Sequence, residues 1–341
     1  MYDIRSMERS EIAELMAKLG EPKFRAEQVW RWTAAAVGGF DEMTNLPKNL
    51  REKLAECCEL HRPEMLAEQK SSDGTIKYLW GLSDGSAVES VVMQYHHGNT
   101  VCISTQVGCR MGCAFCASTR GGKLRDLTPG EMLDEVQWSS KASGLDISNI
   151  VLMGIGEPLD NFDNVMKFLR MVGAPEGAGI GMRHISLSTC GPEGGIERLA
   201  EEDLQLTLSV SLHAPDDETR SRLMPINRAS GGVKRLIERC NAYRKATGRR
   251  VSYEYLLASG ITDTDEKAEL LAKLLSGSDG HVNLIPLNHV DGSPLEPSDP
   301  ERVRRFKEIL ESRGVNVTVR RRMGADIDAA CGQLRSKRQN G

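Results

Sequence analysis

The chain has 341 residues, a net charge of −4 at pH 7 and nine cysteines. This length suits a barrel of about 200–250 residues with a small accessory domain. No apolar stretch approaches the roughly 18 residues of a membrane span, and an odd cysteine number without an export signal argues against a disulfide framework, so we expect a cytoplasmic protein with no membrane contact.

Residues 1–58 predict a small helical module. A helix capped by Ser10 ends at Gly20, a second covers about Ala26 to Ala36, and a third follows Pro47. Two interpretations stay open: an accessory RNA-binding domain, because basic side chains lie among these helices, or a plain packing domain. The basic side chains are Lys23, Arg25 and Arg31.

Residues 59–96 predict a β-hairpin extension. Alternating runs at Thr75 to Leu82 and Ala87 to Gln94 each follow a turn sequence, SSDG and SDG. The second run contains Glu89. Because a glutamate in a strand usually faces solvent, the pattern alone gives Glu89 no role.

Residues 97–322 alternate between strand and helix patterns. Strands are expected at Thr100 to Thr105, Asn149 to Met153, His184 to Ser188, Leu206 to Leu212, Val251 to Leu256 and His281 to Pro286. Helices are expected at Pro129 to Ala142, Phe162 to Val172, Gly195 to Glu201, Val233 to Thr247, Asp265 to Leu275 and Pro300 to Arg313. Six such units predict an α/β fold, a partial (β/α)6 barrel whose chemistry lies at the carboxyl ends of its strands. A further strand is expected at Asn316 to Arg320.

The loop after the first of these strands reads GCRMGCAFCASTRGG. It places Cys109, Cys113 and Cys116 in a C-x3-C-x2-C run. A structural zinc site wants four protein ligands, whereas a four-iron cluster held by three thiolates keeps one iron open to a small molecule. A zinc site completed by a distant histidine and cysteines that are merely packed together are the alternatives.

Further candidates follow the later strands. In GIGEP, Gly156 would let the backbone approach a ligand and Glu157 would accept from an ammonium group. No G-x-G-x-x-G continues this turn, which argues against a dinucleotide fold. The other candidates at this rim are Ser188, Ser211, Leu212, His213 and Asn288.

Residues 323–341 predict a loop followed by a basic tail. Cys331 lies in the loop among small residues, which suits an accessible thiol. From Glu301 to Gly341 there are eleven Lys or Arg against five acidic residues. This excess suits a phosphate-facing surface or, equally, a solvated helix face with a tail.

The C-x3-C-x2-C run, with Phe115 before its last cysteine, resembles the signature of the radical S-adenosylmethionine (SAM) superfamily. Together with Glu89, Cys102, GIGEPLDN, SLHAP, LMPIN, HVNLIP and DIDAACGQLR, it makes the chain resemble the RlmN/Cfr family of RNA methyltransferases over about residues 10–338. This resemblance implies a [4Fe-4S] cluster on Cys109, Cys113 and Cys116. It also implies that SAM, two molecules per turnover, is held by Gly156, Glu157, Ser188, Ser211, Leu212, His213 and Asn288.

The resemblance further implies methylation of adenine C2 in one adenosine of the peptidyl-transferase region of 23S rRNA and in the adenosine 3′ of the anticodon of some tRNAs. Cys331 would carry the methyl group and link covalently to the RNA, Glu89 would take the ring proton, and Cys102 would release the product by forming a disulfide with Cys331. An external electron donor such as flavodoxin and a monomeric state are also implied. A Cfr-like C8 methyltransferase and a metal-stabilised RNA-binding protein are the alternative functions.

Overall fold

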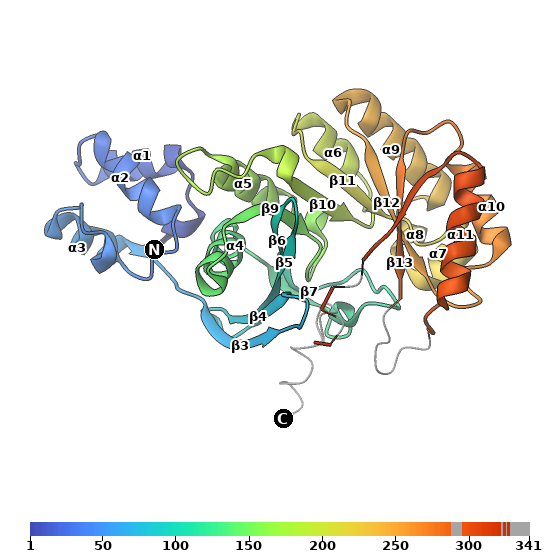
Figure 1. Cartoon of the computed structure of the whole chain (residues 1–341). Helices are drawn as coiled ribbons and strands as arrows, with labels where there is room; N and C mark the ends of the chain where they lie inside the picture. The colour runs from blue at the N-terminus through green and yellow to red at the C-terminus, as the bar shows by residue number, and fades with distance from the viewer. Residues whose placement is uncertain (288–294, 322, 325, 328–341) are drawn as a thin grey trace.

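A ten-stranded sheet organises the computed structural model, which describes residues 1–287, 295–321, 323–324 and 326–327 (Figure 1). The strands lie in the order β14-β13-β12-β11-β10-β9-β6-β5-β4-β3. Their bounds are β3 Glu64–Lys70, β4 Ile76–Gly81, β5 Ala87–Tyr95, β6 Gly98–Cys102, β9 Ile147–Leu152, β10 Ile185–Thr189, β11 Thr207–Ser211, β12 Val251–Leu257, β13 His281–Pro286 and β14 Asn316–Val319. Strands β3 to β6 pair antiparallel, and β6 and β9 to β14 pair parallel.

Helices connect the parallel strands and cover one face of the sheet. Their bounds are α4 Pro129–Ser143, α5 Phe162–Gly173, α6 Gly195–Glu201, α7 Asp217–Leu223, α8 Ile226–Ala229, α9 Gly232–Thr247, α10 Asp265–Leu274 and α11 Pro300–Ser312. Side-chain caps begin several of them; the Thr128 hydroxyl, for example, accepts from the Glu131 N–H at 3.2 Å at the start of α4. The predicted α/β partial barrel is confirmed, and β14 adds a seventh parallel strand.

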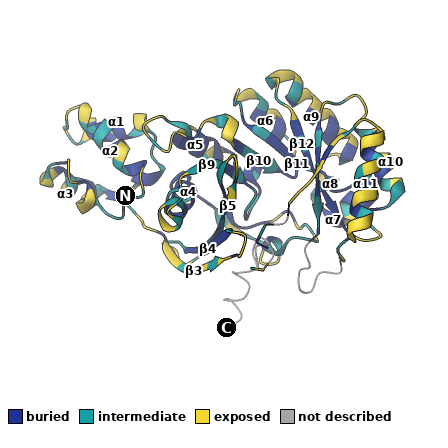
Figure 2. Ribbon diagram, viewed as in Figure 1, coloured by how far each residue is buried: buried dark blue, intermediate teal, exposed yellow. Residues whose placement is uncertain are grey.

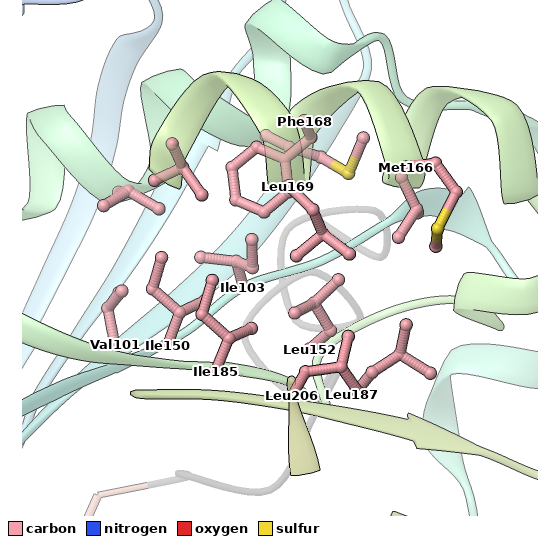
Figure 3. Packing of buried hydrophobic residues seen from close by; sticks show 14 of the residues in the cluster. Val101, Ile103, Ile150, Leu152, Met166, Phe168, Leu169, Ile185, Leu187 and Leu206 are labelled. Atoms are coloured by element: carbon pink, nitrogen blue, oxygen red, sulfur yellow. The ribbon is translucent and has the colours of Figure 1, made fainter. Parts of the chain in front are cut away.

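The two faces of the parallel strands differ in chemistry. On the outer face, Ile150, Leu152, Ile185 and Leu187 pack beneath Phe168 and Leu169 of α5 (Figure 3). On the inner face the alternate positions are mainly polar. They include Ser186, Ser188, Ser209, Ser211, Glu254 and Asn283. The period of two along each strand therefore separates a hydrophobic core from a polar barrel interior, and Figure 2 shows the exposed residues concentrated on the outward sides of the helices.

The N-terminal module lies at the opposite end of the molecule from α10 and α11 (Figure 1). It contains α1 Arg9–Lys18, α2 Phe24–Thr33, α3 Lys48–Cys57 and a two-stranded parallel sheet of β1 Tyr2–Asp3 with β2 Cys58–Glu59. The expectation that Ser10 caps the first helix is wrong. Glu8 is the N-cap instead, and its N–H donates to the Glu11 carboxylate at 2.6 Å, so Ser10 lies inside the helix.

Arg5 joins this module to the barrel. Its guanidinium is 2 % exposed, forms an ion pair with Asp134 of α4 and donates to the Gln137 side chain at 2.9 Å. It also donates to the backbone carbonyls of Thr33 and Ala35. One buried cation therefore connects the end of α2 to α4, and this contact sets the module against the outer helical layer.

Residues 59–96 are expected to form a two-stranded hairpin, but the structure has three strands there. The strand at β3 was not expected; its burial pattern is mostly exposed and intermediate, so the sequence shows no clean alternation. Strand β5 pairs with β6, which makes the extension continuous with the barrel sheet. Among the described helices, none is long and apolar enough to span a bilayer.

Candidate active site

The cysteine loop is tied at its base by a small antiparallel sheet of β7 Gln106–Gly108 and β8 Lys123–Asp126. The Cys109 N–H donates to the Gly122 carbonyl at 3.1 Å, which closes the loop just above this sheet. Within the loop, the Cys116 N–H donates to the Cys113 carbonyl at 3.1 Å. The three cysteines thus lie in one compact loop, as binding to a shared cluster requires.

Asp160, in the loop after β9, fastens the cysteine loop from outside. Lys123 donates to its carboxylate at 3.0 Å, Gln106 does so at 3.0 Å, and Arg110 pairs with both carboxylate oxygens. Burial opposes ionisation here, but hydrogen bonds from Arg110, Gln106 and Lys123 hold the pKa of Asp160 below its usual value. Asp160, the aspartate of GIGEPLDN, therefore anchors the cysteine loop.

A cavity of about 280 Å³ opens between the cysteine loop and the carboxyl ends of the parallel strands. This volume is near the lower end of small-molecule sites. All three cysteines of the run line it. The predicted residues that also line it are Gly156, Glu157, Ser188, Ser211 and His213, whereas Leu212 is buried behind the wall and Asn288 lies outside the described residues.

Glu157 is the most firmly held carboxylate of the cavity. It is 4 % exposed and accepts from the Thr189 hydroxyl at 2.7 Å, from the Cys190 N–H at 2.8 Å and from the Leu159 N–H at 3.1 Å. Burial raises the pKa of Glu157, although hydrogen bonds from Cys190 and Thr189 oppose this. Neutral donors therefore orient the carboxylate beside β10 and leave it suited to a cationic ligand group.

The two glycines of GIGEP line the cavity and are also needed for close packing inside the protein. A Cβ at Gly154 would lie 2.5 Å from the Ile103 carbonyl oxygen, and one at Gly156 would lie 2.7 Å from the Cβ of Gln106. Gly156 also has φ of +111°, which disfavours any side chain. Both glycines bring the β9 loop against the segment that leads into the cysteine loop.

His213 closes the cavity on the β11 side. Its Nδ1 accepts from the Leu256 N–H at 3.1 Å, so the proton of the neutral ring resides on Nε2. Burial, with a smaller effect of the Arg220 charge, lowers the pKa of His213 to about 3. The ring contacts Phe115 edge-on at a centroid distance of 4.8 Å. His213 is thus a neutral donor that packs against the cysteine loop.

Arg220, which was not predicted, links the SLHAP and LMPIN motifs by hydrogen bonds. Its fully buried guanidinium donates to the carbonyls of Cys190, Ser211 and Leu212 and to the Asn227 side chain, at 2.7 to 3.0 Å. It therefore ties the carboxyl ends of β10 and β11 to α8. No local pattern marks an arginine in a short helix as a core residue, so sequence reasoning had no signal for it.

Glu254 and Arg320 line the cavity and were also missed. The Glu254 carboxylate is 4 % exposed and accepts from the Asn283 amide at 2.8 Å. Burial raises its pKa, and the positive charge of Arg320 counteracts that effect. The alternation in VSYEYLL places Glu254 on the opposite face from the buried tyrosines, which is the signal that could have identified it.

The donor set of the loop fits an iron–sulfur cluster. Burial and repulsion from Cys116 raise the pKa of Cys109 to about 11, and burial with repulsion from Cys116 and Cys109 raises the pKa of Cys113. Such thiols stay protonated until a cation replaces their protons. Within the described ranges, no three His, Cys, Asp or Glu side chains are arranged so that they could hold a single metal ion. A cluster does not require that arrangement, because each thiolate binds a different iron.

Two further predicted residues, Glu89 and Cys102, are buried but are not among the residues that line the cavity. Cys102 is 8 % exposed and Glu89 4 % exposed, on neighbouring strands β6 and β5. Cys102 is opposite Val91 in the pairing register, and the Ser104 hydroxyl donates to the Glu89 carbonyl at 2.8 Å, so Glu89 is level with the end of β6. Cys331 lies outside the described residues.

Two family models match the chain. The radical SAM superfamily matches residues 103–273, which contain the barrel and the cysteine loop, and the N-terminal domain of ribosomal RNA large subunit methyltransferases matches residues 2–60. A solved radical SAM methyltransferase from Sphaerobacter thermophilus superimposes with a TM-score of 0.92 at 42 % identity, covering 98 % of this chain and 99 % of that one. The chain therefore belongs to the radical SAM superfamily and has the fold of its methyltransferases.

Curated relatives define the family more closely. A probable dual-specificity RNA methyltransferase RlmN from Desulforamulus reducens is 52 % identical over 98 % of this chain and 96 % of its own length. Its counterpart from Symbiobacterium thermophilum is also 52 % identical, over 98 % and 91 %. The chain belongs to the RlmN family and is a radical SAM RNA methyltransferase, so its cofactors are a [4Fe-4S] cluster and S-adenosylmethionine.

Proposed function

We propose that this enzyme methylates C2 of an adenosine in the peptidyl-transferase region of 23S rRNA and of the adenosine 3′ of the anticodon in a subset of tRNAs. The observation that carries the proposal is one cavity in which three cysteines of a single loop face Glu157, Ser188 and His213 at the strand ends. The relatives named above support the RNA substrate class.

Each part of the cavity has a separate task in this proposal. Cys109, Cys113 and Cys116 would hold the cluster, and three thiolates for four irons would leave room for a small molecule to bind it. Glu157 binds the ammonium of SAM, and Ser188, Ser211, Leu212, His213 and Asn288 position the remainder. When bound, the cluster supplies an electron and SAM supplies both a methyl group and a 5′-deoxyadenosyl radical, two SAM molecules being used per turnover.

The protein residues complete the transfer. Cys331 would lose its thiol proton and accept the methyl group as a thioether, with S-adenosylhomocysteine as the leaving product. One hydrogen atom of that methyl would pass to the 5′-deoxyadenosyl radical, the carbon would bond to the adenine ring carbon, and the remaining unpaired electron would return to the oxidised cluster. Glu89 takes the proton from that ring carbon. Cys102 then attacks the Cys331 sulfur, so that the bond between this sulfur and the transferred carbon breaks and a disulfide forms. A radical route suits adenine C2, which is too electron-poor for ordinary displacement.

The burial of Cys102 and Glu89 on adjacent strands at the inner face, near the end of β6, supports these roles. An external electron donor such as flavodoxin would reduce the cluster. A reductant would also convert the Cys102–Cys331 disulfide back to two thiols before the next turnover. We further propose that the enzyme acts as a monomer in the cytoplasm, where its RNA substrates are found, and that the N-terminal module contributes to RNA binding.

Mass spectrometry of nucleosides from RNA treated with the anaerobically reconstituted enzyme tests this function. We expect 2-methyladenosine in both a 23S rRNA fragment and tRNA, with 5′-deoxyadenosine formed in parallel. Production of 8-methyladenosine would indicate the C8 reaction instead. A protein that holds zinc, does not respond to SAM and binds RNA without modifying it would contradict the proposal.

A further inference from the structure

Lys77 is a buried cation beside the position proposed for proton removal. It lies on β4, opposite Val91 of β5, and Val91 is opposite Cys102 of β6. Because alternate residues of a strand share a face, Lys77, Glu89 and Cys102 all point from the same face of the sheet. That face is the barrel interior, since Val92 and Val101 face the helical layer.

The Lys77 ammonium forms an ion pair with Glu89, with 3.3 Å between Nζ and Oε2. The two residues are diagonal neighbours on adjacent strands, a spacing that long side chains bridge easily. The Lys77 side chain is 0 % exposed and the Glu89 side chain 4 % exposed. Lysine commonly extends its ammonium into water at the end of its apolar stem, but this burial excludes such an arrangement.

Sheet stability alone gives little reason for this pair. Burying two charges costs more free energy than their attraction commonly returns, and apolar residues of similar volume are often as stable or more so. The neighbouring β4 positions Ile76, Tyr78, Leu79 and Trp80 are all buried and show that this strand otherwise follows the apolar rule. A lysine and a glutamate at this depth therefore indicate a chemical requirement.

A second carboxylate approaches the same region from the helical layer. Both oxygens of Glu135 on α4 accept from the Ser104 N–H at 3.1 Å. Burial raises the pKa of Glu135 well above its usual value, and repulsion from Glu131, Asp134 and Glu89 adds to this. Carboxyl groups of the helical layer therefore lie near Glu89, and Lys77 places a cation beside it.

We propose that Lys77 is a positioning residue for RNA methylation: its ammonium holds the Glu89 carboxylate in place and directed at the ring proton that it removes. This inference rests on the proposed function of Glu89. Lys77 acts on the step after the RNA adduct forms and takes no part in SAM cleavage or in methylation of Cys331. Its removal should therefore slow one step selectively.

The test compares Lys77→Met, Lys77→Arg and the control Lys70→Met in the full-length reconstituted enzyme. Lys70 is on β3, its side chain is 65 % exposed, and it pairs with Glu68 at 3.2 Å. The substrate is a 23S rRNA fragment made with adenosine or with adenosine deuterated at C2. The readouts are 5′-deoxyadenosine, methylated Cys331, methylated RNA, the covalent protein–RNA adduct and the deuterium isotope effect on turnover.

For Lys77→Met we expect RNA methylation to fall by at least about tenfold, with a larger isotope effect and more adduct, because proton removal becomes limiting. Cys331 methylation should be unchanged. Lys77→Arg should recover part of the turnover, and Lys70→Met should stay within about twofold of wild type, as expected for an exposed pair. A uniform loss across every readout would mean a merely structural role and overturn the proposal.

Removal of Lys77 alone takes a cation away from a buried carboxylate and could unfold the enzyme, so the double variant Lys77→Met/Glu89→Gln completes the test. It should turn over no more slowly than Glu89→Gln, because both changes disable the same step. A further tenfold loss in the double variant would contradict this role. Absence of 5′-deoxyadenosine and methylated Cys331 in the wild type would instead contradict the proposed function itself.

Discussion

The outer and inner faces of the parallel sheet use the same strands for different purposes. On the outer face, Leu187 and Ile150 pack under α5 with almost no exposure. On the inner face, Ser188, one residue beyond Leu187, and Glu157, in the loop after β9, reach a cavity that also holds three thiols. The outer face therefore accounts for stability and the inner face for reactivity, and mutations should separate the two.

The largest expected effect comes from the cysteine loop. Cys113→Ala should remove the cluster and all RNA methylation while leaving the thermal transition within a few degrees of wild type, because the outer core is untouched. Cys190→Ala is the matched control. This thiol is 5 % exposed, lines the same cavity and lies outside the C-x3-C-x2-C run, so that variant should keep its iron. Iron content and 5′-deoxyadenosine yield measure both, and loss of iron from Cys190→Ala would argue for a fourth thiol ligand.

A substitution in the outer-face core should lower stability and leave the activity of the folded enzyme unchanged. Phe168→Ala removes a side chain with 0 % exposure and should lower the free energy of unfolding by about 3–5 kcal/mol. At a temperature where the variant stays folded, the yield of 5′-deoxyadenosine per folded enzyme should match wild type. Denaturant unfolding and a turnover assay check the two parts; a folded but inactive variant would break the separation of the faces.

Asp134 is a buried carboxyl group in the outer helical layer, so it should make stability depend on pH without affecting the inner-face chemistry. Burial raises the pKa of Asp134 from 3.8 to about 6, although the Arg5 charge counteracts this. The folded protein thus binds this proton more tightly than the unfolded chain. Stability from this group is therefore fully present below pH of about 4 and falls by up to about 3 kcal/mol as pH rises to about 6.

Denaturant titrations between pH 4 and pH 7 measure this slope, and Asp134→Asn should flatten it. Arg5→Met should move the fall to higher pH, because the remaining carboxylate loses its cation. A slope that is identical in wild type and Asp134→Asn would assign the pH dependence to other groups. Neither substitution should alter the loading of the cluster in folded enzyme.

The smallest effect is expected at the surface of the helical layer. Arg305 of α11 pairs with both carboxylate oxygens of Asp265 on α10, and its side chain is 58 % exposed. Arg305→Ala should leave the free energy of unfolding almost unchanged and methylation unaltered, because solvent and salt screen such pairs. A loss of RNA affinity with a flatter salt dependence would instead assign this arginine to the RNA-binding surface.

The sequence by itself determined the alternation of strands and helices, the partial barrel and the cysteine loop, because these depend on local periodicity and on residues a few positions apart. The same local information predicted that Glu157, Ser188, Ser211 and His213 share one rim, since each lies at or just beyond the carboxyl end of a strand. It did not predict β3, whose side chains alternate poorly between apolar and polar.

Only the tertiary structure decided which distant side chains meet inside the barrel. Arg220 reaches carbonyls from two strands, Glu254 meets Asn283, and Lys77 meets Glu89 across paired strands. A charged residue in a strand or short helix has the same local pattern whether it faces water or a buried partner. Its burial depends on strand register and on layers contributed by remote segments, which local sequence patterns do not specify.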